Sequence, residues 1–299
     1  MVSQITIVIN TLNEINNIGK ALKSLHWADE IVVVDGGSID GTIEILEEIR
    51  KKDARLKIFK KKSIGFVEPA RNFAISKATN DWILVLDADE QIPESLAKRL
   101  QEIANNTEQI DFVKVPRQNL IFGHFMKASM WWPDYNIRFF KKGKVKWLNK
   151  IHRPPQTFGD GLDLPAEEEY AIIHQNYLSV SQFLVRMNRY TTIQALELKQ
   201  EGYQFGWKDL FEKPLNEFLS RFFAGEGYKD GLHGLALSLL QAFSFVVVYL
   251  KVWEMDKFKE ENINLLEFED QRNRSAEAIN YWVKKIGHKG NFFGKFFRK

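Results

Sequence analysis

Two aspartates separated by one residue follow an apolar run in the segment WILVLDADEQIP, residues 82–93. A strand that ends in Asp87 and Asp89 stabilises a core poorly, because a buried carboxylate needs a partner or a metal. Residues two apart in an extended chain point to the same side, so both carboxylates can face one ligand. Mg²⁺ and Mn²⁺ take oxygen ligands and bridge proteins to phosphates. The segment therefore predicts a site at which one of these cations stabilises a departing diphosphate.

Further polar side chains follow other apolar runs. Thr11, Asn13 and Glu14 come after ITIVIN, and Asp35 ends EIVVVD ahead of the loop GGSIDGT. Arg71 lies at the start of a predicted helix in GFVEPARNFAISKA, where a guanidinium can meet phosphate oxygens. The ends of three strands thus deliver polar groups to one edge of a sheet, which is stronger evidence for a site than any single motif.

The elements that position these residues alternate along the first hundred positions. Continuous apolar runs at 5–10, 30–35 and 81–87 predict strands covered on both faces, and 55–60 is a further candidate. The segments between them repeat apolar residues every three or four positions, which predicts amphipathic helices. This order favours an α/β fold with a parallel sheet and right-handed crossovers.

Four motifs, TLNE, VVVDGGSIDGT, PARNFA and LVLDADE, occur in this order and at spacings that resemble the family 2 glycosyltransferases, which have the GT-A fold. The resemblance covers about residues 4–120. It implies that Thr11, Asn13, Glu14 and Asp35 hold the nucleoside of a nucleotide-sugar donor and that Arg71 lies near its diphosphate. Asp87 and Asp89 would form the D-x-D motif, which binds a divalent cation and the donor ribose.

The downstream segments WWPDYNIRFFKKGKVKW, IHRPP and GYKDGLHG resemble the branch that includes lipopolysaccharide-core β-glucosyltransferases. The resemblance implies an inverting, metal-dependent hexosyltransferase with a donor that is most plausibly UDP-linked. The implied acceptor is a lipid-linked or cell-envelope saccharide.

One departure concerns the general base. His152 and Arg153 stand where that branch commonly has a His-Glu pair, and an arginine cannot take a proton at neutral pH. Asp134 is the first candidate to replace the glutamate, and Glu167–Glu169 come next.

Each of these residues also has a structural interpretation. Asp87 and Asp89 can cap the helix that follows, Asp35 can hold a turn beside glycine, and Arg71 can pair with Glu68. His152 and His174 have no metal-type spacing and are interpreted as structural. Trp131 and Trp132 are interpreted as core residues rather than a sugar platform.

Two other functions stay open. A non-catalytic nucleotide-sugar-binding protein would explain Arg153. A sugar-phosphate nucleotidyltransferase needs a Gly-rich, basic loop after the first strand, where this chain has NTLNEINN. The usual dinucleotide and P-loop phosphate motifs are missing as well.

Composition narrows the function classes. The 299 residues carry a formal net charge of +3, which is too balanced to indicate a nucleic-acid binder. The absence of cysteine excludes disulfides and thiolate metal sites. The segment MVSQITIVIN reads as a first strand and not as a secretion signal, so a cytoplasmic protein is expected.

The last third of the chain differs in composition from the rest: it contains a long uncharged stretch and a basic, phenylalanine-rich end. Residues 234–250, GLALSLLQAFSFVVVYL, contain no charge and predict a buried or monotopic helix. The C-terminal KKIGHKGNFFGKFFRK interleaves lysine and arginine with phenylalanine, which suits the anionic inner face of a cell membrane; a solvated tail is the alternative. We expect residues 1–120 to form the nucleotide-sugar-binding half of the GT-A domain, 121–177 its acceptor side, and 178–299 a helical region.

Overall fold

The computed structural model describes residues 3–62, 68–106, 109–148 and 154–287. The chain forms two compact units. Unit 1 contains Met1–Leu120 and Pro133–Asn176, and unit 2 contains Ile121–Trp132 and Tyr177–Lys299. The segment 121–132 therefore groups with the C-terminal helices.

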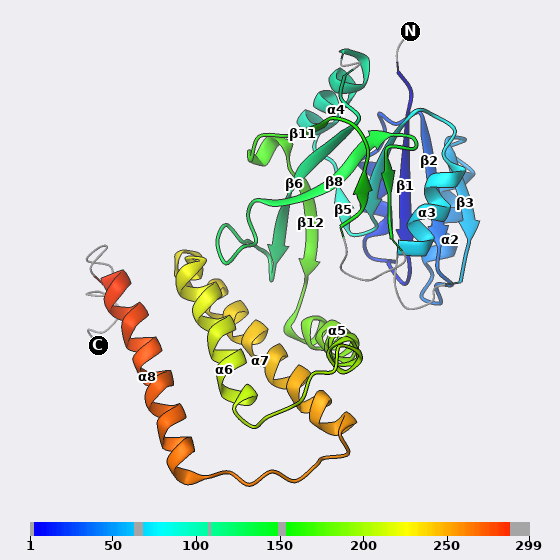
Figure 1. The fold of residues 1–299 in the computed structure, drawn as a ribbon. Coiled ribbons are helices and arrows are strands. Elements are labelled where there is room, and N and C mark those ends of the chain that lie inside the picture. Colours follow the sequence, from blue (N-terminus) through cyan, green and yellow to red (C-terminus); the bar gives the residue numbers. More distant parts are fainter. Residues whose placement is uncertain (1–2, 63–67, 107–108, 149–153, 288–299) are drawn as a thin grey trace. The chain divides into compact units, whose positions relative to one another are not determined.

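Unit 1 is built on a mixed sheet with the strand order β3-β2-β1-β4-β8-β6-β12-β5, and β11 pairs with β6 (Figure 1). Its strands are β1 (Ile5–Thr11), β2 (Glu30–Asp35), β3 (Leu56–Lys60), β4 (Trp82–Asp87), β5 (Glu90–Gln91), β6 (Phe112–Ile121), β8 (Asp134–Lys141), β11 (Gly161–Asp163) and β12 (Ile172–Tyr177). A separate two-stranded sheet joins β9 (Val145–Lys146) to β10 (Gln156–Thr157). The first four strands are mutually parallel, and β8 joins β4 and β6 antiparallel.

Helices cover both faces of this sheet. They are α1 (Ile18–Lys23), α2 (Thr42–Arg50), α3 (Glu68–Lys77), α4 (Glu94–Asn106) and the 3-10 turn η1 (Glu168–Tyr170). The odd-numbered residues of β1, such as Ile7, pack against α1, α2 and α4. Val8 faces the other way and packs in the cluster that includes Ala74 of α3. Strand alternation therefore separates two buried layers, as continuous apolar strands require.

The connections create a switch point between β1 and β4. From β1 the chain moves outward to β2 and β3, then returns through α3 to place β4 on the other side of β1. The registered pairs at the carboxyl ends are Asn10 with Asp87 across β1 and β4, and Thr11 with Asp35 across β1 and β2. In open α/β sheets, ligands bind beside such switch points.

Unit 2 is helical apart from the short strand β7 (His124–Phe125). Its elements are α5 (Val180–Gln200), α6 (Asp209–Phe218), the π-helical η2 (Leu219–Ala224), the 3-10 turn η3 (Gly227–Asp230), α7 (Gly231–Met255) and α8 (Leu265–Gly287). Ser179 caps α5, because its side chain accepts a hydrogen bond from the backbone N–H of Gln182. Helices α5 and α6 both pack on α7.

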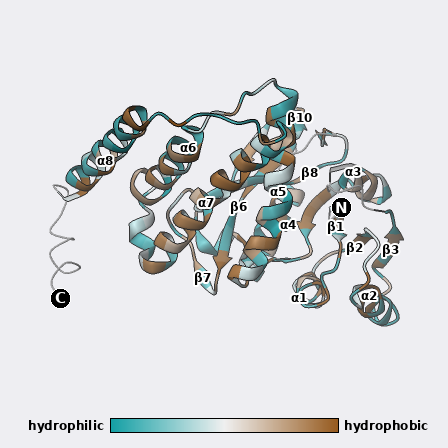
Figure 2. Cartoon of the chain, turned by 90° about the horizontal axis from the view of Figure 1, so that it is seen from below, coloured by the Kyte–Doolittle hydropathy of each residue, from teal (hydrophilic) through white to brown (hydrophobic). Residues whose placement is uncertain are grey.

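Helix α7 contains the uncharged stretch predicted from sequence. Leu237, Ala242 and Val252 are buried, whereas Leu239 and Phe243 are exposed by about half. The segment Gly227–Met255 is long and apolar enough to span a bilayer by length and composition, a test that the core helix of a soluble protein also passes. In Figure 2, α7 is largely brown and α8 largely teal.

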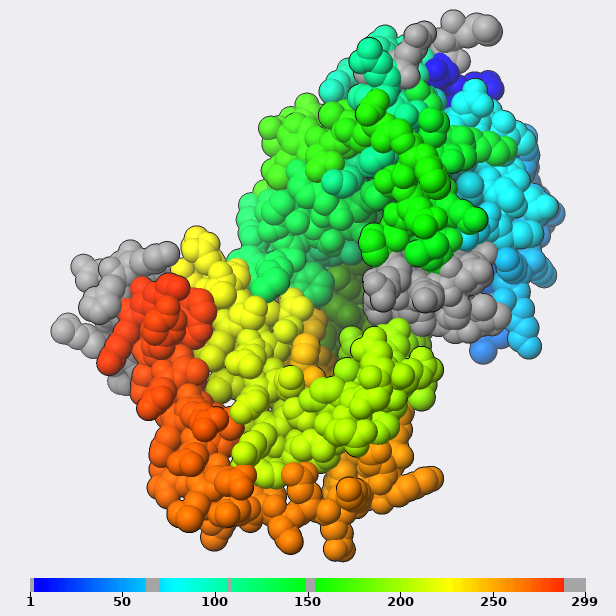
Figure 3. Space-filling view, viewed as in Figure 1, coloured from blue at the N-terminus to red at the C-terminus, as the bar shows by residue number. Residues whose placement is uncertain are grey.

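Helix α8 lies at the outer edge of unit 2, with most of its side chains exposed (Figure 3). Aromatic contacts attach both of its ends. Phe268 stacks on Trp207 with ring centroids 6.0 Å apart, and Trp282 stacks on Phe223 at 6.3 Å. Lys284 and Lys285 end the described helix, and the basic, Phe-rich residues from 288 onward lie outside the described residues.

The predicted fold class is confirmed. The strands predicted at 5–10, 30–35, 55–60 and 81–87 are β1, β2, β3 and β4, and helices flank a mixed sheet whose central strands are parallel. The C-terminal region is helical, as expected.

Candidate active site

A cluster of charged side chains occupies the carboxyl end of β4. The two carboxylate oxygens of Asp87 accept hydrogen bonds from different arginines, Arg71 of α3 and Arg138 of β8, the second at 2.7 Å. Arg138 is 3% exposed, so its charge is effectively buried. Three elements thus bring charge to one point. Asp87 and Arg71, both predicted to bind the donor, are in direct contact.

Glu90 extends this cluster into a chain of ion pairs. Its Oε1 accepts from Arg138 at 2.7 Å and from Arg117 at 3.2 Å, and its Oε2 accepts from the backbone N–H of Asp87 at 2.8 Å. Arg117 also donates from Nε to Asp134 at 2.8 Å. Three carboxylates and three arginines, counting Arg71, therefore alternate in a charge-balanced network. Such balance is what makes buried charges tolerable.

Asp134, the predicted base, is heavily hydrogen-bonded. Its Oδ2 accepts from Arg117 and from Asn119 Nδ2 at 2.9 Å, and its Oδ1 accepts from Asn136 Nδ2 at 3.0 Å. Oδ2 carries the bonds from Arg117 and Asn119, whereas Oδ1 accepts one side-chain bond and keeps a second lone pair that can take a proton.

The arginines control the ionisation of both aspartates. Burial alone would raise the pKa of Asp87, but the charges of Arg138 and Arg71 hold that pKa well below its ordinary value of 3.8. Burial likewise opposes ionisation of Asp134, and Arg117 with the two asparagine amides lowers its pKa overall. Both side chains are therefore ionised at neutral pH.

Asp89 faces a histidine. Asp89 Oδ2 lies 3.5 Å from His174 Nε2, and His174 Nδ1 lies 2.7 Å from Asn119 Oδ1. The Asn119 amide donates to Asp134 through Nδ2, which fixes Oδ1 as an acceptor and assigns the proton to His174 Nδ1. Nε2 is then turned toward the carboxylate. His174, which the sequence pattern predicted to be structural, is buried, with 7% exposure.

The donor set fits a divalent cation in part. A carboxylate oxygen and an imidazole nitrogen are both cation ligands, and Asp89 and His174 supply one of each. Both oxygens of Asp87 are engaged by arginines. Within the described ranges, no group of three or more His, Asp or Glu side chains is arranged to hold a metal ion.

The loop after β2 is organised by Asp35. Its carboxylate accepts from the backbone N–H groups of Gly37 at 2.8 Å and Ser38 at 3.0 Å, and from the Ser38 hydroxyl at 2.5 Å. This is the turn-holding role that the sequence also allowed. Asn13, which has a φ of 57°, accepts from Ile39 N–H at 2.9 Å and donates its own N–H to Ser38 Oγ. Asn13 and Asp35 therefore shape one loop.

Glu14 and Thr11 lie beside this loop. The backbone N–H of Glu14 donates to Thr42 Oγ1 at 2.9 Å, and its carboxylate accepts from Asn17 Nδ2 at 2.7 Å. Thr11 is 4% exposed, and its hydroxyl has no hydrogen-bond partner among the described residues. By strand alternation Thr11 and Asp35 lie on the α1/α2 face, whereas Asp87 lies on the α3 face. The predicted donor-binding residues thus lie on both faces of the sheet at the carboxyl ends of its strands.

Helix α3 is fixed against Trp147, the residue that follows β9. Asn72 donates from Nδ2 to the Trp147 carbonyl at 2.8 Å and accepts from the Trp147 N–H at 3.2 Å. The Arg71 guanidinium lies over the Trp147 ring, 5.7 Å from its centroid. Arg71 is therefore held in place by an aromatic face as well as by Asp87.

The structural roles that the sequence also allowed for these residues can be compared with the structure. Helix α4 begins at Glu94, so neither Asp87 nor Asp89 is its cap. Arg71 pairs with Asp87, and the side chain of Glu68 is outside the description. Trp131 packs in an apolar cluster of unit 2, as expected of a core residue. His152 and Arg153 lie outside the described residues, and the segment Glu167–Glu169 is exposed.

Sequence reasoning missed Glu90, Arg117 and Arg138. One signal was available for Arg138, because a charged residue two positions before Phe140 falls on the buried face of an apolar strand. Glu90 directly follows the D-x-D motif, but nothing local marks it as fully buried. Its partners lie 27 and 48 residues further along the chain.

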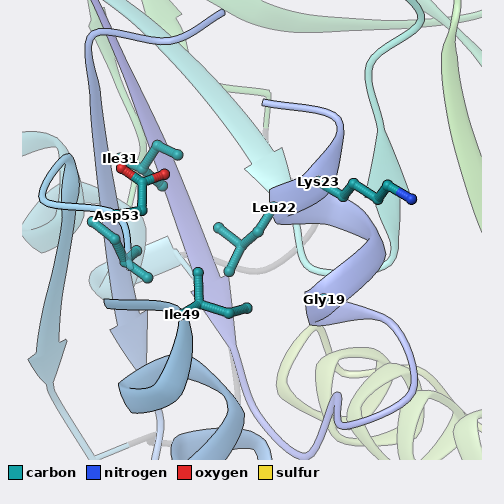
Figure 4. A pocket seen from close by; sticks show the side chains of 7 residues that line it. Gly19, Leu22, Lys23, Ile31, Ile49 and Asp53 are labelled. Carbon is teal, nitrogen blue, oxygen red and sulfur yellow. The ribbon is translucent and has the colours of Figure 1, made fainter. Parts of the chain in front are cut away.

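A pocket of about 110 Å³ opens at the other edge of the sheet (Figure 4). Its lining includes Lys23 at the end of α1, Ile31 near the start of β2, and Leu56 at the start of β3. Because these are the amino ends of the strands, the pocket is separate from the candidate site.

Comparison with known protein families shows to which family the chain belongs. The model of the family described as glycosyl transferase family 2 matches residues 6–159, just over half of the chain. The chain belongs to glycosyl transferase family 2. The matched span contains the four motifs and all six residues of the charge network, so this glycosyltransferase carries its family signature in unit 1.

Several similar proteins are named as glycosyltransferases. A lipopolysaccharide core biosynthesis glycosyltransferase of Rhizobium meliloti, LpsC, is 23% identical over 83% of this chain and 91% of the relative. An uncharacterised glycosyltransferase of Rickettsia typhi is 26% identical over 84% of this chain and 87% of the relative.

Solved structures are more distant. The mannosyltransferase PcManGT of Pyrobaculum calidifontis, in complex with GDP-Man and Mn²⁺, is 15% identical with a TM-score of 0.45, covering 97% of this chain and 89% of that one. TarS of S. aureus, residues 1–349 with UDP, is 16% identical with a TM-score of 0.43, covering 87% and 94%.

Proposed function

We propose that this glycosyltransferase transfers a hexose, with inversion, from a nucleotide-diphosphate sugar to a lipid-linked or cell-envelope saccharide. The observation that carries the proposal is the convergence of Asp87, Arg71 and Asp89 at the switch point between β1 and β4. A UDP-linked donor is favoured by the resemblance to lipopolysaccharide-core enzymes. The similarity to a relative named for that pathway supports the envelope acceptor.

In the proposed reaction, Thr11, Asn13, Glu14 and Asp35 line the nucleoside, and Arg71 and Asp87 lie at the diphosphate and ribose. Asp89, with His174 beside it and Asp87 nearby along the chain, would hold Mg²⁺ or Mn²⁺. When bound, the cation neutralises charge on the departing diphosphate. Each Asp87 oxygen accepts one arginine hydrogen bond and keeps a second lone pair, through which a cation could bind beside Arg71 and Arg138.

The transfer itself is a single displacement. The acceptor hydroxyl oxygen attacks the anomeric carbon, the bond from that carbon to the phosphate oxygen breaks, and the nucleoside diphosphate leaves. The hydroxyl proton passes to a carboxylate base, for which Asp134 stays our candidate. Its lowered pKa makes it a weak base, so this assignment needs its own test.

Release of the nucleoside diphosphate tests the proposal. UDP formation from a panel of UDP-sugars is measured with Mn²⁺ or Mg²⁺ and membrane lipid extract as acceptor source. We expect metal-dependent release that is stimulated by the extract and lost in Asp89→Ala. Asp163→Ala is the matched control, because Asp163 is an exposed aspartate paired with Lys114. Donor binding without release under any condition would favour the non-catalytic alternative, and pyrophosphate release from UTP would identify a nucleotidyltransferase.

Asp134→Asn tests the base in the same assay. A base is indicated if transfer falls at least a hundred-fold while the Kd for the donor is unchanged. Unchanged transfer would remove Asp134 from the chemistry and leave it as a scaffold for Arg117.

We also propose that unit 2 contacts the inner face of the cell membrane. Leu232, Leu239 and Phe243 form an exposed apolar stripe on α7, and Lys284 and Lys285 end α8. Rings and apolar groups at the interface with lysines on anionic head groups suit a peripheral enzyme. We expect sedimentation with phosphatidylglycerol vesicles but not with phosphatidylcholine, weakened in Lys284→Glu/Lys285→Glu. The pair Lys20→Glu/Lys23→Glu on α1 is the charge-matched control; equal weakening by both pairs would argue against a surface on unit 2.

A further inference from the structure

The amide nitrogen and oxygen of Asn10 are buried without a partner at the switch point. Neither its Nδ2 nor its Oδ1 finds a hydrogen bond in the part of the chain that the structure describes. A buried amide left in this state costs about 1 to 3 kcal/mol, so such groups are rare and need an explanation. Sequence analysis had not singled out Asn10, which reads as the last residue of an apolar strand.

Its position connects it to the donor site. Asn10 is the register partner of Asp87 across β1 and β4, and both follow residues of the α3-side layer, Val8 and Val85, at a spacing of two. Arg71, which reaches Asp87 from α3, also has a buried Nε without a partner. Arg138, which binds the other Asp87 oxygen, also has a buried Nε without a partner, so three side chains with an unsatisfied group surround one carboxylate on the same face of the sheet.

The chemistry of the free atoms indicates the ligand. A phosphate offers only acceptors, so it would satisfy the Arg71 Nε and leave the Asn10 Oδ1 unpaired. An amide with both donor and acceptor free is complementary to a group that both donates and accepts, such as a ribose hydroxyl or the edge of a base. The geometry points to Asn10 as a residue that reads the nucleoside part of the donor, next to Asp87.

This inference rests on the proposed function and adds to it a specificity-determining residue. Binding of the nucleoside diphosphate would satisfy the amide that is unsatisfied in the free protein. The unpaired amide of Asn10 thereby lowers the free energy of unfolding of the ligand-free enzyme, whereas the same amide raises its affinity for the donor.

The near-isosteric variant Asn10→Leu separates the effect on stability from the effect on donor affinity. Replacing a buried, unpaired amide by an apolar group of similar shape is expected to leave the denaturation midpoint unchanged or higher. We expect the Kd for UDP, or for GDP if the wild type prefers it, to rise at least ten-fold by calorimetry, and the Kd for pyrophosphate to stay within two-fold. Comparison of UDP with 2′-deoxy-UDP and 3′-deoxy-UDP separates the two contacts: a smaller loss with either deoxy ligand identifies a contact with that ribose hydroxyl, and equal losses with all three identify a base contact.

Thr6→Val is the matched control. Thr6 lies on the same strand and the same face as Asn10 but at the amino end, and its hydroxyl donates to Glu30 at 2.5 Å. We expect this variant to lose stability and keep its nucleotide affinity, the reverse of Asn10→Leu. Asn10→Ala serves as a second variant if leucine is not accommodated.

Wild-type affinity in a folded Asn10→Leu or Asn10→Ala protein would overturn the inference while leaving the proposed function intact. Failure of the wild type itself to bind either nucleoside diphosphate or to release one from a donor would instead overturn the proposed function, and this inference with it.

Discussion

Glu90 is the residue on which the charge network depends. It is fully buried and contacts two arginines from different strands, and it accepts the backbone N–H of Asp87. Buried ion pairs add little net stability compared with apolar residues, but loss of one partner leaves an uncompensated charge. Glu90 is therefore better understood as fixing the arginines around the donor site than as strengthening the core.

Glu90→Gln tests this at the level of stability. Neutralising Glu90 leaves three arginines, of which Arg138 is buried, against two carboxylates, so we expect the free energy of unfolding to fall by about 3 to 5 kcal/mol. Urea denaturation measures it, with the exposed Glu94→Gln as control. A loss below about 1 kcal/mol would show that water or rearrangement compensates the arginines.

The lowered pKa values of Asp87 and Asp134 predict an acid-side loss of stability. A carboxylate whose folded-state pKa is below its ordinary 3.8 stabilises the fold above that pH and loses this contribution as pH falls toward the folded-state value. We expect the denaturation midpoint to be level from about pH 7 to 5 and to fall below about pH 4. Asp134→Asn should reduce the decrease of the denaturation midpoint below about pH 4. An unchanged pH profile would exclude Asp134 as a contributor to this acid-side loss of stability.

At the scale of elements, one end of the sheet carries the candidate site and the other end stabilises the strands. The carboxyl ends of β1, β2 and β4 carry the candidate site, and the amino ends are tied together by Glu30. Its carboxylate accepts from Thr6 at 2.5 Å, from Lys57 at 2.5 Å and from the Thr79 N–H at 2.8 Å. A rigid far end allows the site residues to be held by strands rather than by loops alone.

Glu30→Ala should therefore separate stability from function. Removing a buried, multiply bonded carboxylate is expected to cost about 2 to 4 kcal/mol. The Km for the donor should stay within two-fold, because Glu30 lies at the opposite end of the strands from the switch point. Thermal denaturation and initial rates at a temperature where both proteins are folded measure the two quantities. A large rise in Km with little loss of stability would contradict this division.

At the scale of the whole molecule, the two units have separate cores. Chains with more than one such unit often unfold in more than one step. A ligand that binds only the folded form of one unit stabilises that unit by RT ln(1 + [L]/Kd), about 2.7 kcal/mol at a hundred-fold excess over Kd.

Calorimetry with and without nucleotide tests this division. We expect two transitions, of which a nucleoside diphosphate raises only the one that Glu90→Gln lowers, since both changes act on unit 1. Anionic vesicles should shift the other. A single transition, raised as a whole by nucleotide, would mean that the units unfold together.

The sequence by itself determined the strands, the fold class and the family motifs. Apolar runs and their periodicity are local properties, and the carboxyl ends of parallel strands must share an edge, so the rim residues from Thr11 to Asp89 were predictable. The pairing of Arg71 with Asp87 was not predicted, although both residues were assigned to the site.

Only the tertiary structure decided which groups neutralise one another. Arg138 is 51 residues from Asp87 in the chain, and no local pattern reports an ion pair at that separation. The same holds for His174 beside Asp89 and for the empty hydrogen-bonding capacity of Asn10, which is visible only when every neighbour is in place. Hydrophobic periodicity is encoded residue by residue, whereas the satisfaction of a buried charge or amide is a property of the assembled fold.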